Sequence, residues 1–184
     1  MKETYFYDFL LQWKMLPFED GLPSIKHLDK MDLSTIGHNM FVLERWVDDY
    51  MPVTQFGGRL KRIYGQNMRG LNFLGLFTGR DRAVVSHNIN TMIDYKCGGL
   101  VGWLGIKPGG EYMEIRNYGL PFMSEDGETP QIVGFTEVVN VENQAMLAPG
   151  RISVWPVKRS KLFDLGNGVP AFAQFEDKKY ARLV

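Results

Sequence analysis

The segment VTQFGGRLKRIYGQNMRGLNF, residues 53–73, decides how the rest of this sequence is interpreted. It begins with an extended run over 53–56, and the run breaks at Gly57-Gly58. One amphipathic helical turn follows, and its apolar face, with i, i+3, i+4 spacing, consists of Leu60, Ile63 and Tyr64. Gly65 ends this turn, because glycine adopts the left-handed conformation that closes many helices. A strand that runs directly into short helical turns closed by glycine is typical of a segment that folds over one face of a sheet.

Five strands and one long helix are predicted around this segment. The strands cover 40–47, 53–56, 100–107, 111–120 and 131–140, and the helix covers 81–95. The connection from the second strand to the third is too long for a hairpin, so we expect the first strand to pair with the fifth. The predicted fold class is therefore α+β, with a five-stranded antiparallel sheet and helices on one face. Beyond residue 140 the pattern weakens, and 152–157 is interpreted as an added strand or arm.

Short motifs recur along the chain in a characteristic order. They are Leu22-Pro23-Ser24, Phe41-Val42-Leu43, Phe56-Gly57-Gly58-Arg59-Leu60, Gly65, Gly70-Leu71, Leu120-Pro121-Phe122 and Asp126-Gly127. In this order the sequence resembles the PAS domain, and in particular the small PAS-type proteins found mainly in alphaproteobacteria. The resemblance covers about residues 22–140. It divides the chain into an N-terminal helical segment (1–21), a PAS-like domain (22–140) and a C-terminal extension (141–184).

Composition and charge exclude several classes of protein. Of the 184 residues, 45% are hydrophobic, which is enough for a sizeable core. Lys and Arg number 21 and Asp and Glu number 21, so net charge gives no reason to expect nucleic acid or an anionic membrane surface as a partner. The one cysteine, Cys97, fits a reducing compartment. No apolar run approaches the roughly 20 residues that span a bilayer, and Asp8 and Lys14 interrupt any signal sequence. We therefore expect a cytoplasmic protein without membrane insertion.

The N-terminal helix is predicted over residues 4–16 and has apolar residues on two sides. Its broad arc consists of Tyr5, Phe6, Phe9, Leu10, Trp13 and Leu16. A second stripe, with i, i+4, i+8 spacing, consists of Tyr7, Leu11 and Met15. One alternative is a helix that is buried all round. We expect instead that the arc packs on its own domain and that the stripe forms a homodimer interface, because exposed apolar patches mark interfaces.

A ligand pocket is predicted between the sheet and helix 81–95. Asn88 lies in the apolar arc of that helix, where an unpartnered amide would cost roughly 1–3 kcal/mol. Asn117 lies on the apolar face of an alternating strand, opposite in direction to Glu114 and Arg116. Glu137 is a third polar residue interpreted as facing inward. The predicted lining residues are Asn88, Met92, Trp103, Asn117 and Phe135.

The residues give no support for a metal or a common cofactor. Some PAS domains bind haem through a histidine on the long helix, but His87 falls outside the apolar arc, so we expect it to face solvent. Light-sensing relatives use a cysteine before that helix, whereas Cys97 follows it and is interpreted as a small buried thiol. Neither haem nor flavin is therefore expected. No zinc spacing and no phosphate-binding glycine loop occurs.

Three functions remain open. The first is a non-catalytic sensory or regulatory PAS module that binds a small ligand or a signalling protein partner. The second is a small cone-shaped α+β enzyme, which needs an inward acid next to a histidine. We expect no hydrolase or isomerase activity that depends on His27, His38 or His87. The third is a structural dimerisation domain whose interior is filled by its own side chains. A shared fold does not decide among these functions.

Overall fold

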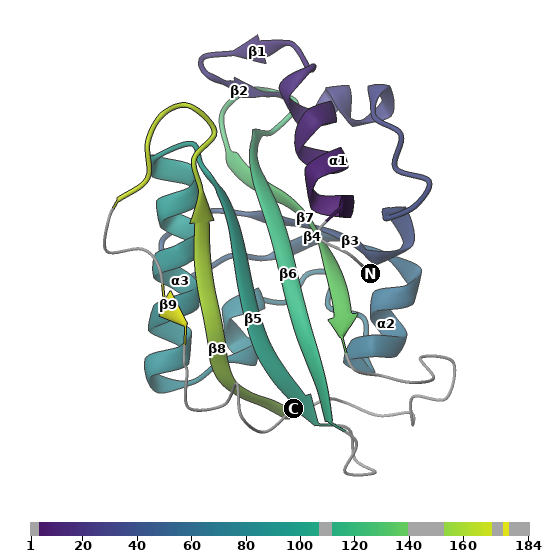
Figure 1. Cartoon of the computed structure of the whole chain (residues 1–184), viewed down its shortest axis with the longest axis vertical. Coiled ribbons are helices and arrows are strands. Elements are labelled where there is room, and N and C mark those ends of the chain that lie inside the picture. The colour runs from purple at the N-terminus through teal and green to yellow at the C-terminus, as the bar shows by residue number, and fades with distance from the viewer. Residues whose placement is uncertain (1–3, 107–111, 140–152, 171–174, 177–184) are drawn as a thin grey trace.

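The computed structural model describes residues 4–106, 112–139, 153–170 and 175–176. Its main sheet is antiparallel and has the strand order β4-β3-β7-β6-β5-β8-β9 (Figure 1). The first five in that order are the predicted strands, and they are β4 (Val53–Phe56), β3 (Met40–Glu44), β7 (Pro130–Val139), β6 (Tyr112–Met123) and β5 (Gly98–Ile106). Three of the predicted strands, 100–107, 111–120 and 131–140, each have one end residue outside the described part of the chain. These residues are 107, 111 and 140.

The first strand pairs with the fifth, as the length of the crossover predicts. In this pairing of β3 with β7, Phe41 lies opposite Gly134 and Leu43 lies opposite Ile132. Strand β7 then pairs with β6, and β6 pairs with β5. Strands β6 and β7 therefore form the middle of the sheet and position the site described below.

Two strands extend the sheet beyond the predicted five. Strand β8 (Ser153–Phe163) runs antiparallel to β5, and β9 (Phe175–Glu176) pairs with β8. The added strand expected at 152–157 is thus confirmed as a strand, and it continues six residues further than predicted. A register shift near Gly102 and Trp103 interrupts its pairing with β5.

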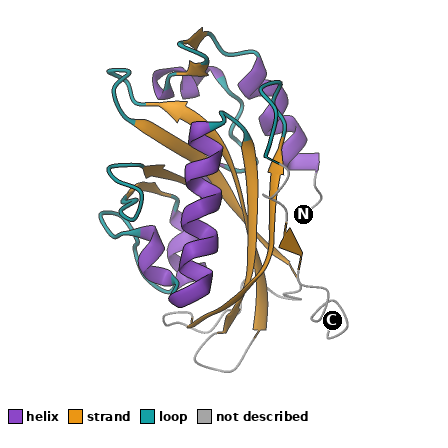
Figure 2. Cartoon of the chain, turned by 90° about the vertical axis from the view of Figure 1, so that its left-hand side faces the viewer, coloured by secondary structure: helices purple, strands orange, loops and turns teal. Residues whose placement is uncertain are grey.

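One face of the sheet, called here the α3 face, is covered by α2 (Gly58–Tyr64), the short 3-10 helix η3 (Phe73–Leu76) and α3 (Gly79–Asp94) (Figure 2). Gly65 ends α2 with φ of 71°, as its position after the helical turn predicts. The predicted helix 81–95 forms two residues earlier, at Gly79, and ends at Asp94. Buried side chains of α2, η3 and α3 form one core with alternate residues of the strands.

The opposite face, called the α1 face, is covered in part by α1 (Thr4–Lys14). Phe6, Phe9, Trp13 and Leu16 are buried there in a second core. The indole Nε1 of Trp13 donates a hydrogen bond of 3.0 Å to the carbonyl oxygen of Pro121 on β6. The chain then passes through β1 (Phe18–Glu19), β2 (Leu22–Pro23) and the 3-10 helices η1 (Ile25–Lys30) and η2 (Gly37–Asn39). The sheet is therefore packed on both faces.

No helix in the described part of the chain combines the length and apolar character needed to cross a membrane.

Candidate functional site

Three glycines lie side by side across the middle of the sheet, and we call them the glycine row. Gly99 on β5 is opposite Gly119 on β6, and Gly119 is opposite Gly134 on β7. Residues directly opposite one another in neighbouring strands share a face. Phe41, which follows next in the row, belongs to the core on the α3 face. The glycine row is thus a trough without side chains on the α3 face.

Three side chains, Met92, Phe41 and Ile132, fill this trough. A Cβ atom added to Gly99 would lie 2.9 Å from Cγ of Met92 and would overlap its sulfur. One added to Gly119 would lie 2.6 Å from Cγ2 of Ile132 and 3.0 Å from Cε of Met92. A Cβ atom added to Gly134 would lie 2.6 Å from Cζ of Phe41. Met92 comes from α3, Phe41 from β3 and Ile132 from β7, and these three side chains occupy the space that side chains of the row would otherwise take.

A cavity of about 20 Å³ remains beside these side chains. It is bounded by α3, η3 and strands β3, β5, β6 and β7, and its lining includes Asn88, Met92, Gly99, Asn117 and Gly119. A space of this size holds about one water molecule, whereas pockets for drug-sized ligands measure about 300–1,000 Å³. This cavity, among the described residues, is thus far smaller than a pocket for a drug-sized ligand.

Asn88 joins α3 to the sheet through one of its two polar side-chain atoms. The residue is only 3% exposed, and its Nδ2 donates a hydrogen bond of 2.8 Å to Oγ of Ser160 on β8. Its Oδ1 is buried and has no hydrogen-bond partner within the described part of the chain. A buried acceptor without a partner costs about 1–3 kcal/mol, so this oxygen is a candidate contact for a hydrogen-bond donor.

Asn117 is fully paired. Its Nδ2 donates to the hydroxyl oxygen of Tyr64 at 3.3 Å, and its Oδ1 accepts a hydrogen bond of 2.7 Å from Thr136. Tyr64 is on α2, so this network fastens α2 to the centre of the sheet. Burial of its hydroxyl raises the pKa of Tyr64 to about 12.

Raising the pH from about 10 to about 12 should destabilise the protein partly through Tyr64. Below pH 10 the phenol is protonated in both folded and unfolded chains; above it the unfolded phenol ionises, while the folded one keeps its proton until about pH 12. Stability should therefore fall in this window by up to about 1.4 kcal/mol per pH unit from this group. Urea unfolding at about pH 8 and about pH 11 checks this. The Tyr64→Phe variant should lose less stability between the two conditions, and an equal loss would contradict the prediction.

The structure brings together three of the five predicted pocket residues. Asn88, Met92 and Asn117 line the same small cavity. Trp103 is buried in the core of the α3 face but lies away from the cavity lining, with its ring centroid 5.0 Å from that of Phe77. Whether the three residues bind a ligand stays a prediction.

The placement of Phe135 in this pocket is wrong. Successive residues of a strand point to opposite faces, and Gly134 faces α3, so Phe135 faces α1. There its ring lies 5.1 Å from that of Tyr118, and it belongs to the core that α1 covers. Glu137 follows the same alternation, and its carboxylate accepts a hydrogen bond from the hydroxyl of Tyr118 at 3.3 Å. The inward orientation expected for Glu137 therefore leads to the α1 face and not to the cavity.

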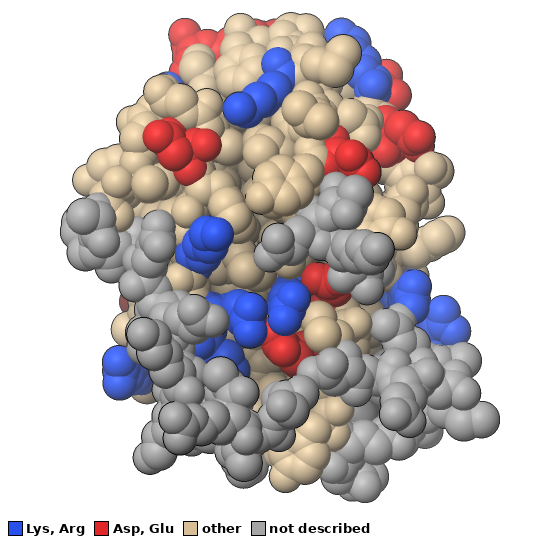
Figure 3. Space-filling view, viewed as in Figure 1, with Lys and Arg blue, Asp and Glu red and all other residues tan. Residues whose placement is uncertain are grey.

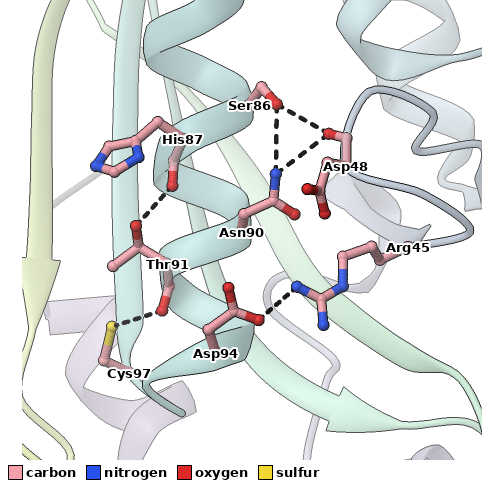
Figure 4. Close-up of polar contacts among 8 residues, drawn as sticks. All are labelled: Arg45, Asp48, Ser86, His87, Asn90, Thr91, Asp94 and Cys97. Carbon is pink, nitrogen blue, oxygen red and sulfur yellow. Dashed lines mark hydrogen bonds and ion pairs between the residues drawn. The ribbon is translucent and has the colours of Figure 1, made fainter.

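Hydrogen bonds and an ion pair connect the outer side of α3 to the loop between β3 and β4 (Figure 4). Arg45 donates from Nη1 to the carboxylate of Asp94 at 2.6 Å. The carbonyl oxygen of Asp48 accepts hydrogen bonds from Ser86 at 2.9 Å and from Asn90 at 3.2 Å. The helix that carries Asn88 and Met92 is thus held by polar contacts on one side and by the core on the other.

His87 and Cys97 lie where the sequence predicts. His87 is exposed on α3, and only its backbone carbonyl is part of the contacts in Figure 4, as acceptor from Thr91. Cys97 is buried after the helix, and its thiol donates to the carbonyl oxygen of Thr91 at 3.7 Å. Burial raises the pKa of the Cys97 thiol to about 11, which disfavours the reactive thiolate. No group of three His, Cys, Asp or Glu side chains suited to a metal ion occurs among the residues described.

Glu114 on β6 pairs on the α1 face with Arg116 of the same strand and with Arg159 of β8. Oε1 of Glu114 lies 2.7 Å from Nε of Arg116 and 3.2 Å from Nη2 of Arg159. Figure 3 shows basic and acidic side chains gathered together on the lower half of this face. Among the described residues of this face, acidic and basic side chains are thus mixed, in line with the balanced composition.

The sequence interpretation missed the glycine row and the part that Phe41 plays beside it. It also missed the hydrogen-bond partners of the two amides, which are Ser160 for Asn88, and Tyr64 and Thr136 for Asn117. A signal for the row was present, because a glycine within a strand often marks a close approach of another group. Its alignment across three strands depends on the register, which the sequence did not provide.

Comparison with known proteins gives one family and a set of similar structures. A family model described as PAS domain matches residues 1–137. The light-state structure of the blue-light photoreceptor Aureochrome1 LOV is similar at 17% identity and a TM-score of 0.44, over 62% of this chain and 91% of that one. The photo-excited blue-light photoreceptor Vivid is similar at 15% identity and a TM-score of 0.46, over 74% and 95% of the two chains. No curated protein matches the chain.

Proposed function

The chain belongs to the PAS domain family, a family of sensory and signalling modules, and on that premise we propose that it is a non-catalytic regulatory module that signals through contacts with protein chains. The first proposed partner is a second copy of the same chain, and the second is a signalling protein in the cytoplasm. The observation that carries the proposal is the apolar stripe that α1 leaves uncovered.

The stripe of Tyr7, Leu11 and Met15 is exposed, although α1 is anchored to the sheet on its other side. The exposed fractions of these side chains are 55%, 61% and 84%. On the other side of the helix, the arc that includes Phe9 and Trp13 is buried. The anchored arc fixes the direction in which the stripe points. A rigid apolar patch of this kind supports an interaction surface.

The spacing of the stripe suits a second copy of the same helix. Tyr7 and Met15 are each four residues from Leu11 in the sequence, but α1 ends at Lys14, two residues before the predicted end, and Met15 lies in the turn that follows. In an antiparallel arrangement about a two-fold axis, Leu11 meets the partner subunit's Leu11, and Tyr7 meets the partner subunit's Met15. A methionine sulfur beside an aromatic ring is a favourable contact, and most homodimers bury the same patch on both subunits.

An open groove beside the stripe provides room for such a contact. It measures about 330 Å³, lies between α1 and residues 32–36, and has Leu11 on its edge. Gln12 donates to the backbone carbonyl of Asp32 at 3.2 Å and so holds the two walls together. Each Leu or Met fully buried in the interface would contribute roughly 1.5–3 kcal/mol before the entropy of association is subtracted.

The enzyme alternative receives no support from the cavity. It requires an acid next to a histidine inside the sheet-and-helix space, and the lining within the described residues includes neither. Glu137, the acid interpreted as inward-facing, lies on the α1 face. The purely structural alternative differs from our proposal in having no signalling partner beyond the second copy.

The double variant Leu11→Asp, Met15→Lys is expected to convert a dimer into a monomer while the sheet stays folded. Both side chains are exposed in the single chain, so replacing them removes only contacts to another chain. The control is Leu71→Asp, Tyr112→Lys, which makes the same exchange of charges at exposed apolar residues outside α1. Light scattering gives the mass, and circular dichroism gives the fold.

The control should remain dimeric at every concentration at which the wild type is dimeric. A monomeric wild type would overturn the homodimer. A double variant that stays dimeric would show that the interface lies elsewhere on the surface.

A further inference from the structure

We propose that the turn between β3 and β4 is a docking site for a partner protein, and that an arginine side chain of this partner binds against the ring of Trp46. The site is called here the aromatic turn and consists of residues 46–50. It would be the surface through which the module contacts its signalling partner, so the assignment rests on the proposed regulatory function. The aromatic turn belongs neither to α1 nor to the core of the α3 face.

Hydrogen bonds hold the backbone of the aromatic turn in place. The amide of Tyr50 donates to the carbonyl oxygen of Val47 at 3.0 Å and closes the turn. The carbonyl oxygens of Asp48 and Asp49, at its tip, accept hydrogen bonds of 2.9–3.2 Å from side chains of the surrounding elements. The donors are Ser86 and Asn90, both drawn in Figure 4, and Asn72 and Arg82. A turn that is already fixed loses little conformational entropy when it binds a partner.

The large side chains of this fixed turn are exposed to solvent. Trp46 and Val47 are each 62% exposed, and Tyr50 is 38% exposed. The ring centroids of Trp46 and Tyr50 lie 5.5 Å apart. The indole N–H of Trp46 is its only hydrogen-bond donor, and it is bound to Oε1 of Glu44 at 2.6 Å. Trp46 therefore offers a partner the face of its ring, and exposed Trp and Tyr side chains on a rigid support are typical anchors of protein interfaces.

The surroundings of the two rings carry an excess of negative charge. Four carboxylates and two guanidinium groups lie on or beside the turn, and they belong to Glu44, Asp48, Asp49 and Asp94, and to Arg45 and Arg82. Arg45 is paired with Asp94 at 2.6 Å, and Arg82 donates to backbone carbonyl oxygens. The carboxylate of Asp48 has no hydrogen bond or ion pair with any residue that the structure describes. It is therefore available to a cation.

An aromatic face beside carboxylates favours a cation, and arginine fits this pair of features best. A cation within about 6 Å of a ring centroid is attracted to the face of the ring, most strongly for Trp. A guanidinium also stacks flat on an aromatic ring and pairs with a carboxylate through two parallel N–H groups, which an ammonium does not. Exposed Trp and Tyr also occur at membrane surfaces, but the excess of carboxylates opposes an anionic lipid surface. The chemistry thus favours a protein segment that carries arginine.

Three tripeptides with blocked ends, Gly-Arg-Gly, Gly-citrulline-Gly and Gly-Lys-Gly, test the site in NMR titrations of the full chain. Citrulline has the shape of arginine without its charge. The indole N–H signal of Trp46 and the backbone amide signals of residues 46–50 report binding. The wild type should bind the arginine peptide at least about fivefold more tightly than the citrulline peptide, and also more tightly than the lysine peptide.

Two variants separate the contributions of the ring and of the charge. Trp46→Leu keeps an apolar side chain but removes the aromatic face, so it should reduce the preference for arginine over citrulline to less than about twofold. Asp48→Asn should weaken binding of the arginine peptide by up to about fivefold and leave binding of the citrulline peptide unchanged. The control is Tyr112→Leu, because Tyr112 is also 62% exposed and lies at the opposite end of the sheet. It should keep the wild-type preference.

Equal binding of the arginine and citrulline peptides by the wild type would overturn the proposal, and so would a preference that survives in Trp46→Leu. Binding to vesicles of phosphatidylcholine and phosphatidylserine that is lost in Trp46→Leu would overturn it in favour of a membrane surface. Circular dichroism checks the fold of each variant. Where Trp46→Leu does not fold, Asp48→Asn and the wild-type titrations still decide the outcome.

The same titration on the double variant Leu11→Asp, Met15→Lys separates the docking site from the proposed homodimer. The aromatic turn lies outside α1, so this variant should bind the arginine peptide as the wild type does. Absence of the arginine preference in an intact dimer would refute the docking site alone. A monomeric wild type that still prefers the arginine peptide would refute the homodimer alone.

Discussion

Replacing Trp13 with alanine is expected to lower the free energy of unfolding by about 3–5 kcal/mol, the usual range for a large aromatic residue removed from a core. Trp13 is 2% exposed, and its ring lies 4.9 Å from that of Phe18. The substitution leaves a cavity under α1 and removes the hydrogen bond from Nε1 to the carbonyl oxygen of Pro121. Both effects act on the attachment of α1 to the sheet.

Urea unfolding followed by circular dichroism measures this loss. The matched control is Trp46→Ala, the same substitution at a tryptophan that is 62% exposed in the loop after β3. It should change the free energy of unfolding by no more than about 1 kcal/mol. Equal losses at the two positions would contradict the packing of α1 described above. Both measurements should be made at one protein concentration, because association contributes to apparent stability.

Gly134→Ala is expected to destabilise the protein by about 1–3 kcal/mol or more, through overpacking at the centre of the sheet. The new Cβ atom would overlap the backbone carbonyl oxygen of Tyr118 and lie 2.6 Å from the ring of Phe41. Backbone of the neighbouring strand can move only by disturbing the β6–β7 ladder, which includes the pair formed by Gly134 and Gly119.

Two other glycines provide graded controls for this prediction. At Gly99 the new atom would meet the flexible end of Met92, which can rotate away, so Gly99→Ala should cost less than Gly134→Ala. At Gly58, in α2, it would meet nothing within 4 Å, and alanine should be neutral or stabilise by about 0.4–1 kcal/mol. Denaturant midpoints for the three variants give the order. If Gly134→Ala were as stable as Gly99→Ala, the close approach of the strands would be refuted.

Much of the fold could be predicted from the sequence because it follows from patterns within short stretches of residues. Alternation along β6 separates Glu114 and Arg116 from Met113 and Ile115, and the structure shows the same division between faces. The length of the crossover was enough to predict that the first strand pairs with the fifth. The order of short motifs was enough to predict the PAS family.

The length of β8 could not be predicted in the same way. Charged residues follow Val157, and a run of that kind indicates a loop or a solvated segment. In the structure Arg159 is paired with Glu114, a residue 45 positions earlier in the chain. That contact, together with the ladder between β8 and β5, depends on residues far apart in the sequence.

The candidate site was predictable in part. A polar residue within an apolar helical arc was enough to identify Asn88, and the same reasoning identified Asn117. The glycine row was not found because its members are 20 and 15 residues apart and come together only through strand register. The error at Phe135 has the same origin, since a shift of one residue along a strand exchanges its two faces.

The pairing of β3 with β7 has a consequence for how the protein is made. On a ribosome, β3 emerges about 90 residues before β7, which takes roughly 5–18 seconds at typical rates of synthesis. During that interval Phe41, Val42 and Leu43 have only β4 as a strand partner, and a two-stranded hairpin is marginally stable in water. The nascent chain therefore carries an apolar strand with one open edge until residues 130–139 have been synthesised, and this interval is when we expect it to be most dependent on chaperones.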